Sequence, residues 1–245
     1  TIASELWRTV EPGGVLVWIV GDGSDDDGET GTSFRQVLHL KSLGFRLHDT
    51  MIYMKSGPSY PRQDAYDQVF EYMFVLSVGR PKTFNPIRDR ENRWFGQKWS
   101  KVRTRRTVDG TLTRTRWSAD EGDRIGKRFN VWQYAVGFGN HGDISKHAHP
   151  ATFPDAPAAD HVMSWTNPGD EVCDPMCGSG TTGVAAVKFG RRFIGIEIEP
   201  RYCDLAIRRI QEELARLPLP FDESPQVGCS PVQNELFRDT ESRDK

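Results

Sequence analysis

The chain has 245 residues, 37% of them hydrophobic and 27% charged, and a formal net charge of −2 at pH 7. That length can bury a sizeable core, so we expect one large α/β domain with an inserted module. No apolar run is long enough to cross a membrane and no signal peptide is visible, so the composition predicts a cytoplasmic protein that is neither secreted nor membrane-bound.

The cysteines and the distribution of charge indicate the redox state of the protein and the kind of partner it binds. The four cysteines include no Cys-x-x-Cys pair, which argues against a zinc site or a disulfide framework and favours reduced thiols. Residues 80–146 hold 16 Lys/Arg against 7 Asp/Glu, a net charge of +9, so the rest of the chain carries −11. A basic block on an acidic body predicts a polyanionic partner at one place only.

The first 44 residues predict a helix, a strand, a loop and a second helix. Apolar residues recur at helical spacing over 1–10, and the apolar run 15–20 is typical of a strand buried on both faces of a sheet. Ser33 is expected to cap the second helix, with Phe34, Val37 and Leu38 facing the core.

Two further strands are expected at 49–54 and 69–77. The loop between them contains a cation, Lys55, small residues and an aromatic ring, Tyr60. A tyrosine in such a loop can stack on a nucleobase, although loop tyrosines more often only pack against the protein.

Residues 80–146 lack a clear period and combine arginines with aromatic rings. Arginine forks suit phosphates and guanine edges, while flat rings suit base stacking or the core of a small module. Two interpretations stay open on composition alone, a DNA-recognition region or a solvated insertion with its own small core. The candidate DNA-binding residues are Arg103, Arg105, Arg106, Arg114 and Arg116.

The stretch after this basic block returns to regular structure. His141, His147 and His149 lie close in sequence, but without a clear fourth ligand we predict no metal site. A short helix is expected around 162–163 and a longer one over 201–217.

The most informative segment is 171–197. An apolar strand ends at Asp174, a Gly-Ser-Gly turn follows at 178–180, and a helix begins at Thr181 or the next residue. Glycine lets a ligand approach the backbone, and the free N–H groups of a helix start favour an anion. Glu197 follows the first glycine by 19 residues, where an acid meets ribose hydroxyls in nucleotide-binding folds. The segment therefore predicts a nucleotide-like cofactor, and the lack of a lysine after the turn argues against a nucleoside triphosphate.

Residues 174–182 read Asp-Pro-Met-Cys-Gly-Ser-Gly-Thr-Thr. This segment resembles the cofactor loop of the S-adenosylmethionine-dependent DNA amino-methyltransferases, Asp-Pro-Phe-x-Gly-Ser-Gly-Thr-Thr. Met176 replaces the usual aromatic residue, and methionine is apolar and adaptable enough to fill the same wall. The order of segments matches the circularly permuted group of that family, in which the recognition region precedes the cofactor loop. The resemblance implies a Rossmann-like class I methyltransferase fold, an α/β three-layer sandwich with a mostly parallel sheet and an inserted DNA-recognition region.

The resemblance also divides the chain. It implies a base-pocket half at 1–79, a target-recognition insertion at 80–148, a cofactor half at 149–217 and a flexible tail at 218–245. S-adenosylmethionine would be the cofactor and double-stranded DNA the partner. Lys55 and Tyr60 would border the pocket for the target base. The implied cofactor-binding residues are Asp174, Pro175, Met176, Cys177, Gly178, Ser179, Gly180, Thr181, Glu197, Ile198, Pro150, Thr152 and Phe153.

Enzymes of this family methylate N6 of adenine or N4 of cytosine in a base flipped out of the duplex. Their catalytic tetrapeptide, Asp-Pro-Pro-Tyr or Ser-Pro-Pro-Tyr, accepts hydrogen bonds from the amine and stacks on the base. Neither version occurs in the sequence. We therefore expect no catalytic residue within 1–245 and a segment upstream of Thr1 that carries the tetrapeptide.

Three functions remain open on the sequence. The first is the DNA amino-methyltransferase that the resemblance implies, and the second is a remnant that binds DNA and cofactor without turnover. The third is a methyltransferase for RNA or a small molecule, although a small-molecule enzyme needs no basic arginine-tryptophan insertion. The residues do not determine the target base, the recognition sequence, the presence of a restriction endonuclease as partner, or the choice between monomer and homodimer.

Overall fold

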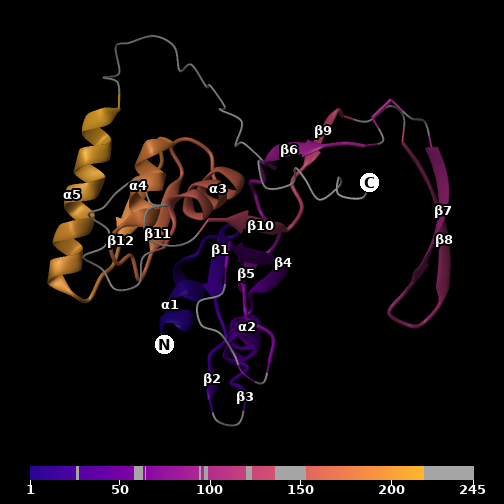
Figure 1. The fold of residues 1–245 in the computed structure, drawn as a ribbon, viewed down its shortest axis with the longest axis horizontal. Coiled ribbons are helices and arrows are strands. Elements are labelled where there is room, and N and C mark those ends of the chain that lie inside the picture. The colour runs from indigo at the N-terminus through magenta and orange to yellow at the C-terminus, as the bar shows by residue number, and fades with distance from the viewer. Residues whose placement is uncertain are drawn as a thin grey trace, which may run out of the picture.

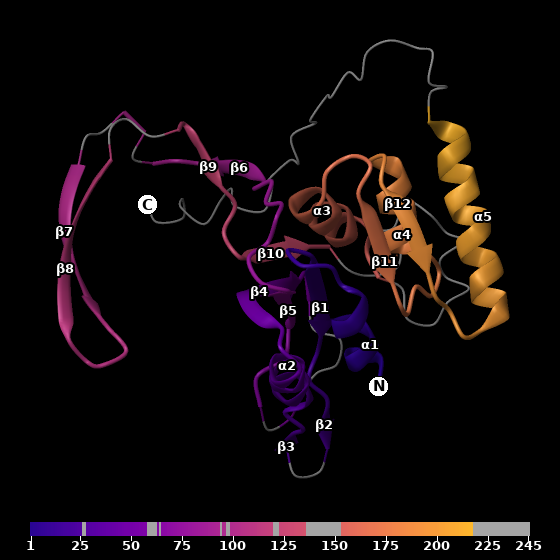
Figure 2. The ribbon, with the colours of Figure 1, turned by 180° about the vertical axis from the view of Figure 1, so that it is seen from behind.

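A computed structural model of the protein describes residues 1–25, 28–57, 63, 65–93, 95–96, 99–119, 123–135 and 153–217. Figures 1 and 2 show the arrangement of its helices and strands. The helices are α1 (Ile2–Thr9), α2 (Thr32–Ser42), α3 (Asp155–Trp165), α4 (Thr181–Lys188) and α5 (Pro200–Arg216). The strands are β1 (Val15–Val20), β2 (Ser24–Asp25), β3 (Gly28–Glu29), β4 (Arg46–Lys55), β5 (Phe70–Ser77), β6 (Arg88–Glu91), β7 (Trp99–Arg106), β8 (Leu112–Ala119), β9 (Ile125–Lys127), β10 (Val131–Tyr134), β11 (Glu171–Asp174) and β12 (Arg192–Gly195).

The largest sheet has the strand order β1-β5-β4-β10. β5 runs antiparallel to both neighbours, with Val15 opposite Ser77 and Met54 opposite Phe70, and β10 runs parallel to β4. The carboxyl ends of β1, β4 and β10 therefore lie at one edge of the sheet. This sheet is mixed, since only one of its three pairings is parallel.

β5 is buried on both faces, which explains its continuous apolar sequence. Phe74 and Leu76 pack with α1 and α2 on one face, whereas Met73 and Val75 face a second cluster that includes Trp132. Because side chains alternate along a strand, one apolar run supplies both layers of the core.

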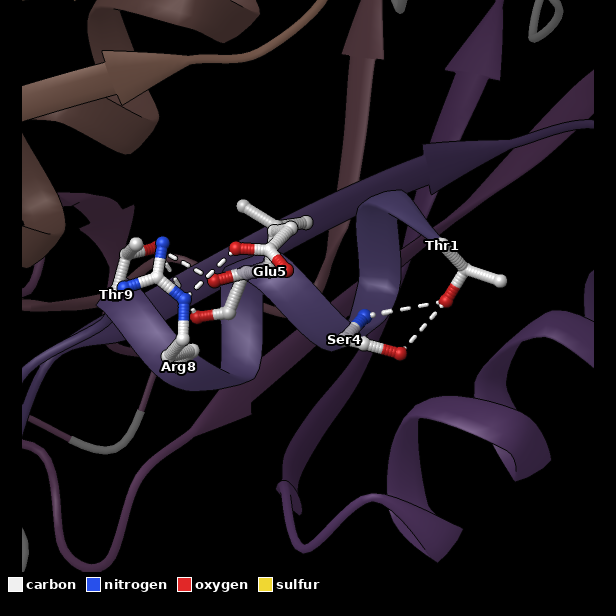
Figure 3. Close-up of polar contacts among 6 residues, drawn as sticks. Thr1, Ser4, Glu5, Arg8 and Thr9 are labelled. Atoms are coloured by element: carbon white, nitrogen blue, oxygen red, sulfur yellow. Dashed lines mark hydrogen bonds and ion pairs between the residues drawn. The ribbon is translucent and has the colours of Figure 1, made fainter.

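Local polar contacts within α1 stabilise the helix itself (Figure 3). The Ser4 amide donates to Thr1 Oγ1 at 3.3 Å, and Arg8 Nε donates to Glu5 Oε2 at 2.8 Å. The threonine caps the helix and the ion pair spans its middle turn, while Leu6 packs into the core.

The N-cap of α2 lies two residues before the predicted one. Its N-cap is Gly31, and Ser33 instead donates its amide, at 3.0 Å, and its hydroxyl to the carboxylate of Asp22. Although burial raises the pKa of Asp22, these hydrogen bonds hold it below its ordinary value. The bonds to Asp22 accompany a buried Ser33 side chain. Phe34 and Leu38 are exposed, so the predicted core positions of these two residues are wrong.

The segment from α3 to α5 builds a second, smaller unit. β11 and β12 form a parallel pair, and α4 packs against this pair as well as against α3 and α5. Within the described ranges β1 pairs only with β5 and β11 only with β12, so each of these two strands has one edge without a strand partner.

The insertion between β5 and β10 contains two antiparallel ribbons, β6 with β9 and β7 with β8. The β7–β8 ribbon stands away from the rest of the molecule in both views (Figures 1 and 2). β10, which lies inside the predicted insertion, joins the main sheet instead, and its Trp132 is buried.

Candidate functional site

The loop between β11 and α4 is braced by Asp174, the last residue of the strand. Its Oδ1 accepts a hydrogen bond from the Met176 amide at 3.1 Å, and its Oδ2 accepts one from Thr182 Oγ1 at 2.6 Å. The carboxylate therefore joins the end of the strand to the first turn of the helix and fixes the path of the loop between them.

Glu197 closes the loop from the other side. Its Oε2 accepts a hydrogen bond from the Gly178 amide at 2.8 Å, and its Oε1 accepts one from the Glu199 amide at 2.9 Å. Gly178 has φ +50°, in the left-handed region that favours glycine. The structure thus brings Glu197 and the glycine turn together as the sequence predicts.

α5 packs directly on this turn. A Cβ at Gly180, where φ is +79°, would lie 2.8 Å from Ala206 Cβ, so glycine is required there by packing as well as by backbone conformation. Arg209, only 3% exposed, donates to the Ser179 carbonyl and, at 3.3 Å, to Ser179 Oγ. Sequence reasoning missed Arg209 because a charged residue on a helix is normally assigned to solvent.

Apolar side chains next to Glu197 are uncovered. Met176 is 55% exposed, Ile196 56% and Ile198 97%. Thr181, at the start of α4, has a buried Oγ1 with no hydrogen-bond partner in the described part of the chain. An apolar surface, a carboxylate and an unsatisfied buried hydroxyl at one loop are what a flat, partly polar ligand requires.

The cysteines of this loop are not activated. Burial, followed by the nearby carboxylates of Asp174 and Glu197, raises the pKa of Cys177 to about 11. Burial likewise raises the pKa of Cys173, with Asp174 and Glu171 adding to the effect. Both thiols are protonated at pH 7, so neither is a nucleophile.

Lys55 lies at the carboxyl end of β4, and its Nζ forms an ion pair with Glu71 Oε1 at 2.5 Å. Both side chains are largely buried, and burial together with the charge of Glu71 raises the pKa of neighbouring Tyr53 to about 12. A Cβ at Gly21, just after β1, would lie 3.3 Å from Glu71 Cγ. Glu71 therefore belongs to the same sheet edge, and no sequence motif pointed to it.

Phe153 connects the two halves of the protein. Its ring lies edge-on to Tyr53 at a centroid distance of 6.3 Å and packs against both the main-sheet cluster and the cluster of α3 and α4. Three other predicted ligand contacts, Tyr60, Pro150 and Thr152, lie outside the described residues, as do the three clustered histidines and the tail 218–245. In the described ranges no group of three or more His, Cys, Asp or Glu is placed to hold a metal ion, and no helix there is long and apolar enough to span a membrane.

The predicted DNA-binding arginines all fall on the β7–β8 ribbon. Arg103, Arg105 and Arg106 lie on β7, and Arg114 and Arg116 on β8. The described side chains among them are exposed, and they lie on a separate element from the braced loop. The structure therefore brings the loop residues together in one place and the arginines in another.

A family model described as DNA methylase, N6_N4_Mtase, matches residues 1–208. The chain belongs to this DNA methylase family. The orphan methyltransferase M.BamHII of Bacillus amyloliquefaciens is 46% identical to the methylase over 211 residues, which cover 85% of this chain and 79% of M.BamHII. The family predicted from the cofactor loop is confirmed.

Two solved structures have the same fold as the methylase. The cytosine-N4-specific PvuII DNA methyltransferase matches with a TM-score of 0.61 and 17% identity, covering 88% of this chain and 73% of that one. The M1.HpyAVI–SAM complex matches with a TM-score of 0.56 and 21% identity, covering 85% of this chain and 80% of that one. These matches confirm the predicted class I methyltransferase fold.

Proposed function

We propose that the methylase transfers a methyl group from S-adenosylmethionine to an exocyclic amine of double-stranded DNA, either N6 of adenine or N4 of cytosine. The observation that carries the proposal is the loop held between Asp174 and Glu197, with apolar side chains left uncovered beside it. S-adenosylmethionine combines a flat adenine, a ribose with two hydroxyls and a charged amino-acid tail, and each part has a matching feature in this loop.

The proposed contacts follow from those features. Met176 and Ile198 offer apolar surface to the adenine, and Glu197 offers acceptors to the ribose hydroxyls. The N–H groups at the start of α4 suit the carboxylate of the tail. When bound, the cofactor supplies an electrophilic methyl group on its sulfonium.

We assign Lys55 and Tyr60 to the border of the target-base pocket. Glu71 holds the Lys55 ammonium at the sheet edge, so the lysine can donate to a base only from a fixed position. A flipped base is recognised through hydrogen bonds to its edge and stacking on its face, which are the contacts that a lysine and a tyrosine can make.

The groups that accept hydrogen bonds from the target amine stay a prediction. Neither Asp-Pro-Pro-Tyr nor Ser-Pro-Pro-Tyr occurs in residues 1–245. β1 and β11 each have a free edge among the described residues, and an unpaired buried backbone group costs about 1–3 kcal/mol. We propose that a strand carrying the tetrapeptide pairs at these edges, and that residues 1–245 alone bind cofactor and DNA without transferring a methyl group.

We further propose that the arginines of the β7–β8 ribbon bind the DNA, in a soluble cytoplasmic enzyme of a prokaryote or phage. Arginine is the residue best suited to bidentate contacts with phosphates and guanine edges. The exposure of Arg103, Arg105, Arg106 and Arg114 leaves them accessible to a polyanion.

The test is methyl transfer by the protein expressed from the complete reading frame that contains residues 1–245. It is incubated with labelled S-adenosylmethionine and either duplex DNA or RNA, and the nucleosides are separated after digestion. We expect label in N6-methyldeoxyadenosine or N4-methyldeoxycytidine. Label only in RNA would favour the RNA methyltransferase, and absence of label from both, with cofactor and DNA still bound, would favour the binding remnant. Methyl transfer by residues 1–245 alone would overturn the proposal for the tetrapeptide strand.

A further inference from the structure

The β7–β8 ribbon has a geometry that its arginine content alone does not imply. Its two strands pair without interruption from Trp99 opposite Ala119 to Arg106 opposite Leu112. Eight residues a strand correspond to roughly 26 Å at about 3.3 Å a residue. The ribbon stands clear of the body in both views (Figures 1 and 2), so both of its faces are open to a partner.

The turn at the far end of the ribbon is well defined. The Thr107 amide donates to the Thr111 carbonyl at 2.9 Å, and Gly110 takes φ +85°, which favours glycine. Asp109 accepts hydrogen bonds from the Thr107 hydroxyl and, at 3.0 Å, from the Thr111 amide. These bonds, that of the Thr107 hydroxyl first, hold the pKa of Asp109 below its ordinary value. The only acid of the ribbon and its turn is therefore tied into the turn.

Basic residues lie on both faces of the ribbon. In an antiparallel pair, residues directly opposite each other share a face and successive residues alternate. The first face holds Lys101, Arg103 and Arg105, and the second face holds Arg106 and Arg114.

The cross-strand neighbours of these cations do not neutralise them. Thr115 lies opposite Arg103 and Thr113 opposite Arg105 on the first face, and Thr104 lies opposite Arg114 on the second. A ribbon whose only role is to face solvent would be more stable with opposite charges across its strands, because such cross-strand pairs are stabilising. Among the described ribbon residues 101–106 and 112–114, every charged residue on either face is basic.

Duplex DNA matches this distribution of charge. Its major groove is about 12 Å wide, admits a two-stranded β-ribbon, and has a wall of phosphates on each side. A ribbon lying flat on the groove floor would turn one face toward the bases and the other toward solvent, which would leave the arginines of the outer face without a partner. We propose, building on the function proposed above, that the ribbon stands in the major groove with its first face toward one phosphate wall and its second face toward the other.

Two matched double variants test this arrangement. Arg103→Gln with Arg105→Gln neutralises the first face, and Arg106→Gln with Arg114→Gln neutralises the second. Arg208→Gln with Arg216→Gln removes the same charge from exposed positions of α5 and serves as the control. The measurement is the affinity for a duplex as a function of salt concentration, with the thermal unfolding midpoint as a check on folding.

Each ribbon variant should bind DNA more weakly at low salt and lower the log–log salt slope by about 1.8, since each lost phosphate contact removes about 0.9. The α5 control should keep the slope of the unaltered protein. A lower salt slope in only one of the two ribbon variants would overturn the two-wall arrangement, although it would still support DNA binding by the ribbon. Unchanged slopes for both ribbon variants would instead remove the DNA-binding role of these arginines from the proposed function.

Discussion

The loop between β11 and α4, where we propose that the cofactor binds, and the β7–β8 ribbon place their candidate functional residues in opposite ways. At the loop, Asp174, Glu197 and Arg209 are each bonded to the backbone or to side chains of other segments, so contacts within the protein fix their positions. On the ribbon, the described side chains from Lys101 to Arg114, arginines among them, are exposed on two paired strands. A small cofactor is bound by a preformed site, whereas a large polyanion can be bound by charge spread over an open surface.

The largest expected contrast between the two regions is at their glycines. Gly180→Ala places a Cβ against Ala206 at a positive φ, so it should lower the free energy of unfolding by about 2–4 kcal/mol. Gly110→Ala has the same backbone conflict, but open space surrounds it in the ribbon turn. Its strain should be relieved locally, with global unfolding in urea changed by less than about 0.5 kcal/mol. An equal loss of unfolding free energy in the two variants would contradict the expectation that the ribbon turn contributes little to the global stability of the protein.

The stability of the methylase should decrease at acid pH because His161 is buried. Burial lowers its pKa to about 4 from an ordinary 6.5, so between these pH values the unfolded chain binds a proton that the folded chain does not. Stability should therefore be intact above pH 6.5 and fall by about 3 kcal/mol as the pH drops to 4. His161→Leu should lose this part of the pH dependence in urea titrations, and a variant that loses stability as steeply as the unaltered protein would exclude the histidine as the cause.

Arg209 and its neighbour Arg208 offer a matched pair on α5. Arg209→Met leaves the Ser179 carbonyl without its charged donor, at a cost of about 2 kcal/mol in unfolding free energy. Arg208→Met removes an exposed ion pair and should change stability by less than about 0.5 kcal/mol. Similar thermal melts for the two variants would show that the buried bond does not support the loop.

The smallest effect is expected at Thr182. Thr182→Val removes the hydrogen bond to Asp174 Oδ2 but keeps the shape of the side chain, so stability should fall by about 1 kcal/mol. Affinity for S-adenosylmethionine should fall with it, because Asp174 loses one of the two bonds through which it braces the loop. Thr113→Val on the ribbon changes only an exposed contact and should alter neither property in the same melts and titrations.

The sequence was informative where function and folding require the same residues. The bounds of β1, the strand–turn–helix of the cofactor loop and the place of Glu197 all follow from local patterns, because apolar runs and glycine turns have few structural solutions. The ribbon was missed because its described side chains, residues 101–114, are exposed on both faces, which removes the alternation of apolar and polar residues that identifies a strand. Its Asp109-Gly110 pair was the available hairpin signal. Arg209, Glu71 and the orientation of α2 depend on partners distant in sequence, which no local pattern reports.

Calorimetric titration of S-adenosylmethionine into the protein and its Glu197→Ala variant tests the central claim most directly. Glu197 is proposed to bind the ribose while it holds the Gly178 amide, so the variant should lose about 1.5–3 kcal/mol of binding free energy, or roughly 10- to 150-fold in affinity. Glu199→Ala, which removes a carboxylate two residues away and keeps the backbone amide that bonds Glu197, should bind as the unaltered protein does. Equal affinities for the protein and its Glu197→Ala variant would place the cofactor elsewhere and contradict the account.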